Sequence, residues 1–151
     1  MVGIVVVSHS ERAAEGIAEI AAEMAGDTRI EPVGGDGKGG IGTVPDAIEA
    51  AIDAAAGIDA EGGSDAENGS DAGDENGGDL DGPDPVVVLV DLGSAVMNAD
   101  VAVELSDAEA VIADAPVLEG AVNAAVAATD PSATVESVRE QAEAARDIKK
   151  L

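Results

Sequence analysis

An α/β fold built on a four-stranded parallel sheet is predicted by two features of the sequence, its uninterrupted apolar runs and the helical segments between them. Residues 2–7 (VGIVVV) and 86–90 (VVVLV) are continuous apolar runs, which is typical of central strands buried on both faces of a parallel sheet. Strands that alternate with helices form βαβ units, whose helices cover both faces of the sheet. The sequence therefore predicts a doubly wound domain with helices on both faces.

Two weaker strands complete the predicted sheet, at residues 30–33 and 110–113. Pro32 has no amide proton for strand pairing, so its strand is expected at an edge. Right-handed crossovers with a helix on each face favour the strand order 2-1-3-4. In that order the chain reverses direction between the first and third strands, and a crevice is expected at their carboxyl ends.

The first helix is expected to begin after Ser10, whose side chain can cap it, and to end at Gly26. Its apolar residues recur at helical spacing, and we expect the face that they form to pack on the sheet. These residues are Ala13, Ile17, Ile20 and Met24.

The next two helices follow the second and third strands. One is predicted from Thr43, with Pro45 in its first turn, to Gly57. Its apolar residues are Ile48, Ala51, Ile52 and Ala55. The other is predicted to begin near Ser94, and its apolar residues at spacing four are Met97, Val101 and Leu105.

Two further helices are predicted at the carboxyl end of the chain. A short one covers residues 119–128 and ends before Pro131. The last is expected to be capped by Ser132. Its apolar residues are Val135, Val138, Ala142 and Ala145, and basic residues near its negative end are Arg146, Lys149 and Lys150.

The length suits one domain spanning residues 1–151. Residues 59–85 are an exception within it, because they contain ten acids, seven glycines and a single large aliphatic residue, Leu80. Such a segment cannot bury enough apolar surface to offset the entropy of ordering it. We therefore predict a disordered acidic insertion at 59–85.

The composition excludes several classes of function. Seven basic residues against 32 acids, with no aromatic residue, argue against nucleic-acid binding. The same charge disfavours an anionic membrane surface, and no apolar run reaches the roughly 18 residues that span a bilayer. The absence of cysteine excludes disulfides, thiolate catalysis and Cys-based zinc sites, and it fits a cytoplasmic protein.

The acidic excess is not confined to the insertion, because 22 acids (32 minus 10) remain against seven bases outside it. Such charge opposes compaction unless salt screens it. We therefore predict adaptation to molar salt, where the Debye length is about 3 Å. The alternative is that the charge serves solubility alone.

His9 and Asp91 are the residues that can carry chemistry. His9 is the sole histidine and follows the first predicted strand, while Asp91 follows the third. Both are therefore expected at the crevice. An imidazole offers a nitrogen nucleophile near neutral pH. The carboxylate of Asp91 can fix the tautomer that exposes the other ring nitrogen. The alternatives are a histidine without function and an aspartate that merely begins a helix.

Glycine-containing turns beside this pair can bind an anion. Gly93 and Ser94 open one predicted helix, while Gly42 and Thr43 open another, and helix amino ends attract negative charge. With Ser10, these are the candidate phosphate-binding residues. The stretch at 39–43 lacks the ending of a P-loop. One histidine and scattered acids form no metal-ligand pattern, so no metal is expected.

Four blocks of the sequence, in order, resemble one family. They are GIVVVSHSERAAEGIAEIAAEM at 3–24, IGT at 41–43, VVVLVDLGSAVMNADVAVEL at 86–105 and APVLEGAVNAAVAA at 115–128. Together they resemble the phosphocarrier subunits of phosphoenolpyruvate-dependent dihydroxyacetone kinases, a branch of the mannose-type enzyme IIA superfamily. The resemblance covers most of the chain except residues 57–85.

The resemblance implies that His9 is phosphorylated, that Asp91 orients it and that amides near Gly93 and Ser94 bind the phosphate. It also implies a homodimer. In this family the phosphocarrier protein of the phosphotransferase system supplies the phosphate, which passes to ADP on the nucleotide-binding kinase subunit. The resulting ATP phosphorylates dihydroxyacetone on a third subunit. No tightly bound cofactor is expected. Because some members carry fused phosphocarrier domains and this sequence does not, a separate phosphocarrier protein is expected as donor.

Three other interpretations stay open. A mannose-type sugar-uptake subunit would pass the phosphate to a transport component instead of ADP. A receiver-like regulatory domain would be phosphorylated on Asp91, although Ser8 and His9 stand where a receiver needs a pair of acids. An anion-binding regulatory module would form no covalent phosphate at all.

Overall fold

The computed structural model describes residues 1–58 and 82–151 and confirms the predicted sheet. Its four strands are β1 (Gly3–Ser8), β2 (Ile30–Gly34), β3 (Val86–Val90) and β4 (Ala110–Ile112). All pairs are parallel and the order is β2-β1-β3-β4, as expected. Pro32 lies in β2, which is an edge strand. Most of the prediction made for residues 59–85 concerns residues outside the described part of the chain.

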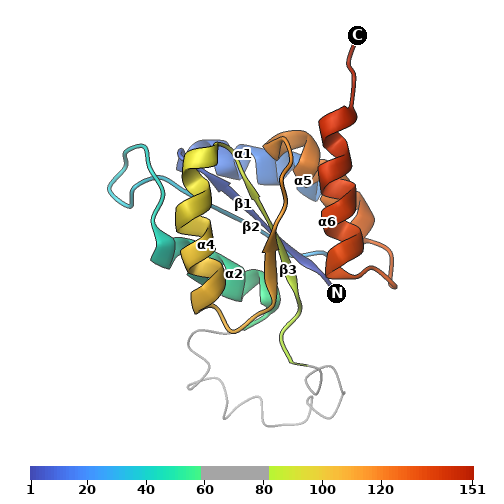
Figure 1. The fold of residues 1–151 in the computed structure, drawn as a ribbon, viewed down its shortest axis with the longest axis horizontal. Coiled ribbons are helices and arrows are strands. Elements are labelled where there is room, and N and C mark those ends of the chain that lie inside the picture. Colours follow the sequence, from blue (N-terminus) through green and yellow to red (C-terminus); the bar gives the residue numbers. More distant parts are fainter. Residues whose placement is uncertain (59–81) are drawn as a thin grey trace.

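Helices cover both faces of the sheet (Figure 1). One face carries α1 (Glu11–Ala22), α5 (Val117–Ala128) and α6 (Val135–Ala144), and the other carries α2 (Pro45–Ala56) and α4 (Val96–Leu105). Short 3₁₀ turns precede α4 at Gly93–Ala95 and follow α6 at Ala145–Asp147. Among the described residues no helix is long and apolar enough to cross a membrane.

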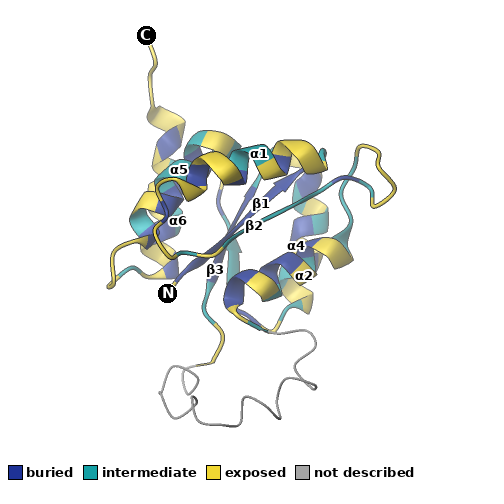
Figure 2. Cartoon of the chain, turned by 180° about the vertical axis from the view of Figure 1, so that it is seen from behind, coloured by how far each residue is buried: buried dark blue, intermediate teal, exposed yellow. Residues whose placement is uncertain are grey.

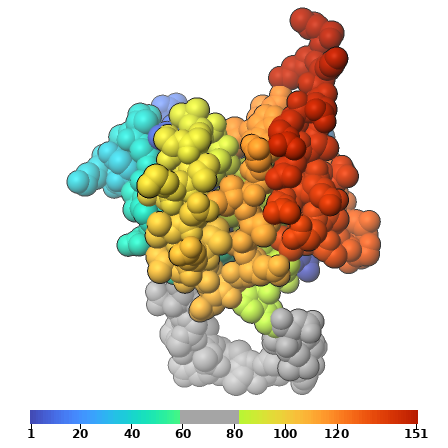
Figure 3. Space-filling view, viewed as in Figure 1, coloured from blue at the N-terminus to red at the C-terminus, as the bar shows by residue number. Residues whose placement is uncertain are grey.

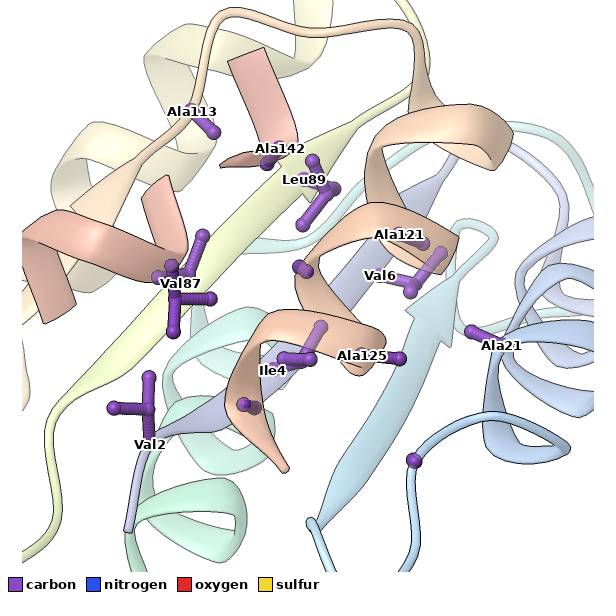
Figure 4. Packing of buried hydrophobic residues seen from close by; sticks show 14 of the residues in the cluster. Val2, Ile4, Val6, Ala21, Val87, Leu89, Ala113, Ala121, Ala125 and Ala142 are labelled. Atoms are coloured by element: carbon purple, nitrogen blue, oxygen red, sulfur yellow. The ribbon is translucent and has the colours of Figure 1, made fainter. Parts of the chain in front are cut away.

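The strands supply the bulk of the core and the helices supply small residues. Side chains of Ile4, Val6 and Leu89 point from β1 and β3 toward alanines of α5 and α6, such as Ala121 and Ala142 (Figure 4). All of these residues are fully buried. Figure 2 shows that each helix turns a buried stripe toward the sheet and an exposed one outward. Alanine stripes allow the helices to approach the sheet closely.

The predicted inner face of α1 is partly wrong. Ile17 is partly buried and packs against the core, but Ile20 and Met24 are half exposed, at 50% and 53%. The buried residues of the helix are Ala14, Ala18 and Ala21. Both sets of residues follow helical spacing, so periodicity alone did not separate them. The branched side chains of the sheet already fill most of the core, and small alanines pack closest to them. The helix begins after Ser10 as expected but ends at Ala22, before Gly26.

The predicted inner face of α4 is also wrong. Met97, Val101 and Leu105 do share one face, but that face points to solvent, with Met97 77% exposed. The buried residues of this segment are Ala95, Ala99 and Ala102. In the space-filling view α4 and α6 form prominent ridges on the surface (Figure 3). The predicted inner face of α2 is confirmed, because Ile48, Ala51, Ile52 and Ala55 are all buried.

Two helix starts also differ from the prediction. The cap of α6 is Thr134, not Ser132. The Thr134 hydroxyl accepts a hydrogen bond from the Ser137 amide, and the Thr134 amide donates one to the Ser137 hydroxyl. Ser132 instead donates to Asp130 in the preceding turn. The α2 helix begins at Pro45, with Val44 as its cap residue, rather than at Thr43.

The predicted disordered insertion extends too far toward β3. Asp84 has a defined position, where it accepts a hydrogen bond from Arg29 at 2.6 Å and lies 3.4 Å from the amino terminus. Its amide donates to the Ala56 carbonyl at 3.0 Å, and Pro85 accepts from Gly3 at 2.8 Å. Residues 82–85 are therefore anchored to α2 and β1, at the amino end of β3.

Candidate active site

The site lies at the carboxyl ends of the two central strands, where the crevice was predicted. His9 follows β1 directly and Asp91 follows β3. The amide of Asp91 donates to the Val7 carbonyl at 3.0 Å, which continues the pairing of the two strands into the site. The sheet therefore fixes the backbone of both residues. Their side chains are mostly buried, with 21% of His9 and 19% of Asp91 exposed.

Both carboxylate oxygens of Asp91 contact the segment around His9. Oδ1 lies 3.0 Å from His9 Nδ1, while Oδ2 accepts from the His9 amide at 3.0 Å and from the Ser8 hydroxyl at 2.9 Å. The Ser8 hydroxyl in turn accepts from the Ser10 amide at 3.1 Å. Because an ionised carboxylate only accepts hydrogen bonds, Nδ1 must carry the proton. The lone pair of neutral His9 is therefore on Nε2.

The electrostatics favour an ionised Asp91. Partial burial raises the pKa of this carboxyl, but hydrogen bonds from the His9 amide, the His9 ring and the Ser8 hydroxyl, with the attraction of the His9 ring, outweigh it. The pKa of Asp91 therefore lies below its ordinary value. A negative carboxylate beside Nδ1 also stabilises positive charge on the ring, such as develops when Nε2 forms a new bond.

Ser94 contacts the other ring nitrogen of His9. Its Oγ lies 2.9 Å from His9 Nε2. Since Nε2 carries no proton in the tautomer that Asp91 selects, the Ser94 hydroxyl donates to it. Ser94 belongs to the exposed 3₁₀ turn that opens α4, with Gly93 beside it. The hydroxyl can rotate from the nitrogen to an oxygen of a group that binds there.

The other candidate phosphate-binding residues near His9 already make hydrogen bonds within the protein. The Gly42 amide donates to the His9 carbonyl at 2.8 Å, so it holds the backbone of the histidine. Thr43 Oγ1 accepts from Asn98 at 2.8 Å. The Ser10 hydroxyl accepts from the Ala13 amide at 3.2 Å as the cap of α1. A direct contact of Gly42, Thr43 or Ser10 with phosphate stays a prediction.

Sequence reasoning placed Ser8 beside His9 but gave it no role, and it missed Asn98. Ser8 is only 2% exposed, and it was the one buried polar residue at the end of an otherwise apolar strand. That position beside a candidate histidine was the available signal. Asn98 links α4 to the segment that contains Gly42 through two hydrogen bonds. The sequence carried no signal for it, because the link joins residues 55 positions apart.

A cavity of about 400 Å³ adjoins Asp91 on the side of β4. Its lining includes Gly93, Val96, Ile112 and Ala115. A larger cavity of about 490 Å³ lies far from His9, at the other end of the sheet between Met1, Thr28 and Pro131. The candidate site built on His9 and Asp91 therefore does not coincide with the larger of these two cavities.

Comparisons with known proteins identify the family of this chain. A family model described as the PTS system fructose IIA component, EIIA-man, matches residues 3–61 and 63–139. A Lactococcus lactis protein named PTS-dependent dihydroxyacetone kinase, phosphotransferase subunit DhaM, is 33% identical over 141 residues, 93% of either chain. A Listeria innocua protein named PEP-dependent dihydroxyacetone kinase 2, phosphoryl donor subunit DhaM, is 35% identical over 131 residues, covering 83% of this chain and 85% of that one.

A solved structure extends the likeness to the fold. The protein EF1359, whose title gives its function as unknown, superposes with a TM-score of 0.65 at 25% identity. The match covers 94% of this chain and 92% of that one. The family model spans nearly the whole described chain and includes both His9 and Asp91. This chain therefore belongs to the mannose-type enzyme IIA family of the phosphotransferase system.

Proposed function

We propose that this chain is the phosphoryl donor subunit of a phosphoenolpyruvate-dependent dihydroxyacetone kinase and that it carries the phosphoryl group on His9. The observation that carries the proposal is the pair of contacts on one ring: Asp91 on Nδ1 at 3.0 Å and the Ser94 hydroxyl on Nε2 at 2.9 Å. This arrangement leaves a single nucleophilic nitrogen and points it at the surface. Relatives named as DhaM supply the system in which such a carrier works.

The first transfer is a displacement at phosphorus. The Nε2 lone pair of His9 attacks the phosphoryl group of the donor's phosphohistidine, the donor's N–P bond breaks, and its electron pair returns to the donor's ring. Asp91 stabilises the positive charge that the His9 ring gains. The proton of the ring stays on Nδ1 throughout. Nothing is oxidised or reduced.

The second transfer runs in the opposite direction. An oxygen of the terminal phosphate of ADP, held on the nucleotide-binding kinase subunit, attacks the phosphoryl group on Nε2. The N–P bond breaks and the electron pair returns to the imidazole, so that His9 is ready for another cycle. We expect the Ser94 hydroxyl and the amides near Gly93 to share the charge of the phosphoryl oxygens. The Gly42 amide is already bound to the His9 carbonyl, so the turn at Gly42 and Thr43 would first have to release that bond to contact phosphate through this amide.

The partners follow from this role. The donor is the phosphocarrier protein of the phosphotransferase system, and the acceptor complex contains the ADP-binding and dihydroxyacetone-binding kinase subunits. The reaction takes place in the cytoplasm. The family resemblance implies that the carrier is a homodimer, which light scattering of the purified chain tests directly.

Labelling tests the proposal. The protein is incubated with labelled phosphoenolpyruvate and the upstream phosphotransferase proteins, and the stability of the label is measured. We expect a label that is lost in acid and stable in alkali, as for phosphohistidine, and its absence from His9→Ala. Normal labelling of His9→Ala would exclude His9, and loss of the label in alkali would indicate an aspartyl phosphate on Asp91.

The acceptor separates this function from sugar uptake. After labelling, the carrier is mixed with the kinase subunits and ADP, and the appearance of labelled ATP is followed. A kinase carrier transfers its label to ADP. A sugar-uptake subunit keeps it until a transport component is added, and an anion-binding module never acquires one.

A further inference from the structure

Asn98 joins two segments that each contact His9. Its side-chain amide donates to Thr43 Oγ1 at 2.8 Å and to the Thr43 carbonyl at 3.3 Å. Thr43 follows Gly42, whose amide binds the His9 carbonyl. Asn98 also lies four residues after Ser94, which meets His9 Nε2. The half-buried Asn98 side chain therefore connects the segment of Gly42, which binds the His9 backbone, with the helix that follows Ser94, which contacts the His9 ring.

Both contacts lie on segments that the sheet does not hold. Gly42 is in the connection between β2 and α2, where Gly35, Gly37, Gly39 and Gly42 all have positive φ. Glycine-rich backbone has many accessible conformations, so its position depends on the bonds that tie it down. Ser94 is in a 3₁₀ turn ahead of α4. The Asn98 side-chain amide ties the connection between β2 and α2 to α4, the helix that follows the 3₁₀ turn of Ser94.

We propose that Asn98 is a positioning residue for phosphoryl transfer, which rests on the function proposed above. Asn98 does not touch the reacting atoms. It holds Thr43, and through it the Gly42 amide, against α4, so that His9 keeps the orientation in which Nε2 faces the incoming phosphorus. In-line transfer is sensitive to orientation, and displacement of a reacting group by about 1 Å costs up to 100-fold in rate.

The chain offers a matched control in the same pair of helices. Ser106, directly after α4, donates to Asp53 of α2 at 2.6 Å. This bond also ties α4 to the α2 segment, but at the opposite end of the pair, far from His9. Ser106→Ala therefore removes a comparable link between the helices without affecting Gly42 or Ser94.

The experiment measures phosphoryl transfer from the phosphorylated donor protein to Asn98→Ala, Asn98→Leu and Ser106→Ala in the full chain. Asn98→Leu keeps the branching and the number of side-chain heavy atoms, and it covers the case in which the alanine variant folds poorly. We expect kcat to fall about tenfold in both Asn98 variants with KM within about twofold, and Ser106→Ala to stay within about twofold of wild type. Equal effects of the Asn98 and Ser106 variants, or unchanged rates at Asn98, would overturn the proposal.

Amide hydrogen exchange provides a second readout that does not depend on catalysis. Loss of the Asn98 bonds should speed exchange of the Gly42 amide about tenfold, while Ser106→Ala leaves it unchanged. Unchanged protection of Gly42 in both Asn98 variants contradicts the positioning role. If the wild-type chain acquires no label on His9, the proposed function fails, and the exchange result still decides what Asn98 does.

Discussion

At the scale of single residues, three hydrogen bonds to one carboxylate fix the tautomer and the orientation of His9, as the proposed nucleophile requires. Ser8 and the His9 amide hold Oδ2 of Asp91, and this leaves Oδ1 aimed at Nδ1. The ring therefore cannot turn without losing a charge-assisted hydrogen bond. The contact between Asp91 Oδ1 and Nδ1 therefore fixes both the tautomer and the orientation of the His9 ring.

Asp91→Asn is expected to slow labelling of His9 by at least about 100-fold, because an amide can donate to Nδ1 and so favour the tautomer with the proton on Nε2. The side chain keeps its size, so the fold should be retained. Asp130→Asn makes the same charge change away from the site, in the turn before α6, and should leave the rate within about twofold of wild type. The initial rate of labelling measures both. A normal rate in Asp91→Asn would mean that Asp91 does not select the tautomer.

The same carboxyl should contribute to stability in a pH-dependent way. The pKa of Asp91 is below its ordinary value of 3.8, so the folded state binds this proton less readily than the unfolded state. Its contribution to the free energy of unfolding is therefore fully present above pH 3.8 and lost as the pH falls through the lower folded pKa. Urea unfolding should show a gap between wild type and Asp91→Asn at about pH 6 that narrows toward about pH 2.5. A constant gap would contradict this assignment.

How much of the site was predictable differs from residue to residue. His9 and Asp91 could be placed together because parallel strands end at the same edge of a sheet. Ser94 followed from its position at the start of a helix. The atom that Ser94 contacts, the use of the Gly42 amide on the His9 carbonyl and the Asn98 link could not be predicted, because they depend on loop conformation and not on strand order.

At the scale of elements, β2 lies so close to β1 that the site depends on a glycine. A Cβ on Gly34 would lie 2.3 Å from the Ser8 carbonyl oxygen and 2.9 Å from that of Ser10. Both atoms belong to backbone on either side of His9. The edge strand therefore contributes to the position of the histidine although no side chain of β2 reaches it.

Gly34→Ala is expected to lower the free energy of unfolding by about 1–3 kcal/mol, because backbone must move to admit the methyl group. It should also slow labelling of His9. The control is Gly16→Ala, since a Cβ on Gly16 of α1 would meet nothing within 4 Å. That change should stabilise the protein by about 0.5–1 kcal/mol through helix propensity. Denaturant unfolding measures both, and equal effects of the two changes would argue against the close approach.

The helix faces explain where prediction of the fold failed. The strands and their order were predictable, because continuous apolar runs and an edge proline have few interpretations. The inner faces of α1 and α4 were not, because alanine recurs at helical spacing beside the larger aliphatic residues. The volume already filled by the strand residues decides between the two stripes, and volume is a property of the packed structure. Ile4, Val6 and Leu89 fill it on the α1 face, and Val5, Val7 and Val88 fill it on the α4 face.

At the scale of the whole molecule, we expect the net charge of −25 to make the stability of the fold depend on salt. Lowering the salt concentration from molar to a few tens of millimolar lengthens the Debye length from about 3 Å to about 20 Å. Repulsion among acids then reaches across the domain, and we expect the Tm to fall markedly. Calorimetry in KCl at several concentrations measures it. A Tm independent of salt would favour charge as an aid to solubility alone.

The acidic stretch between α2 and β3 should be dispensable for phosphoryl transfer. The described residues on either side of 59–81 lie at the end of α2 and ahead of the amino end of β3, whereas His9 and Asp91 lie at the carboxyl ends of their strands. Residues 82–85 must be kept, because Asp84 pairs with Arg29 and its amide binds the Ala56 carbonyl. That last bond holds the two chain ends close together, so a short connection can replace 59–81. Closure of the longer loop costs little, since each doubling of length adds about 0.6 kcal/mol.

Replacement of residues 59–81 by a four-residue Gly-Ser turn is therefore expected to preserve the fold and the rate of His9 labelling in high salt. Some loss of solubility is expected, because nine of the ten acids of the original 59–85 segment disappear and Asp84 remains. The matched control is a variant that keeps 59–81 and changes Asp84 to Ala, which should lower stability by removing the Arg29 pair and leave the labelling rate unchanged. A shortened protein that folds normally but labels ten times more slowly would show that the acidic stretch contacts the donor or the site. It would then act across the length of the sheet, and the assignment of transfer to the carboxyl ends of β1 and β3 alone would be wrong.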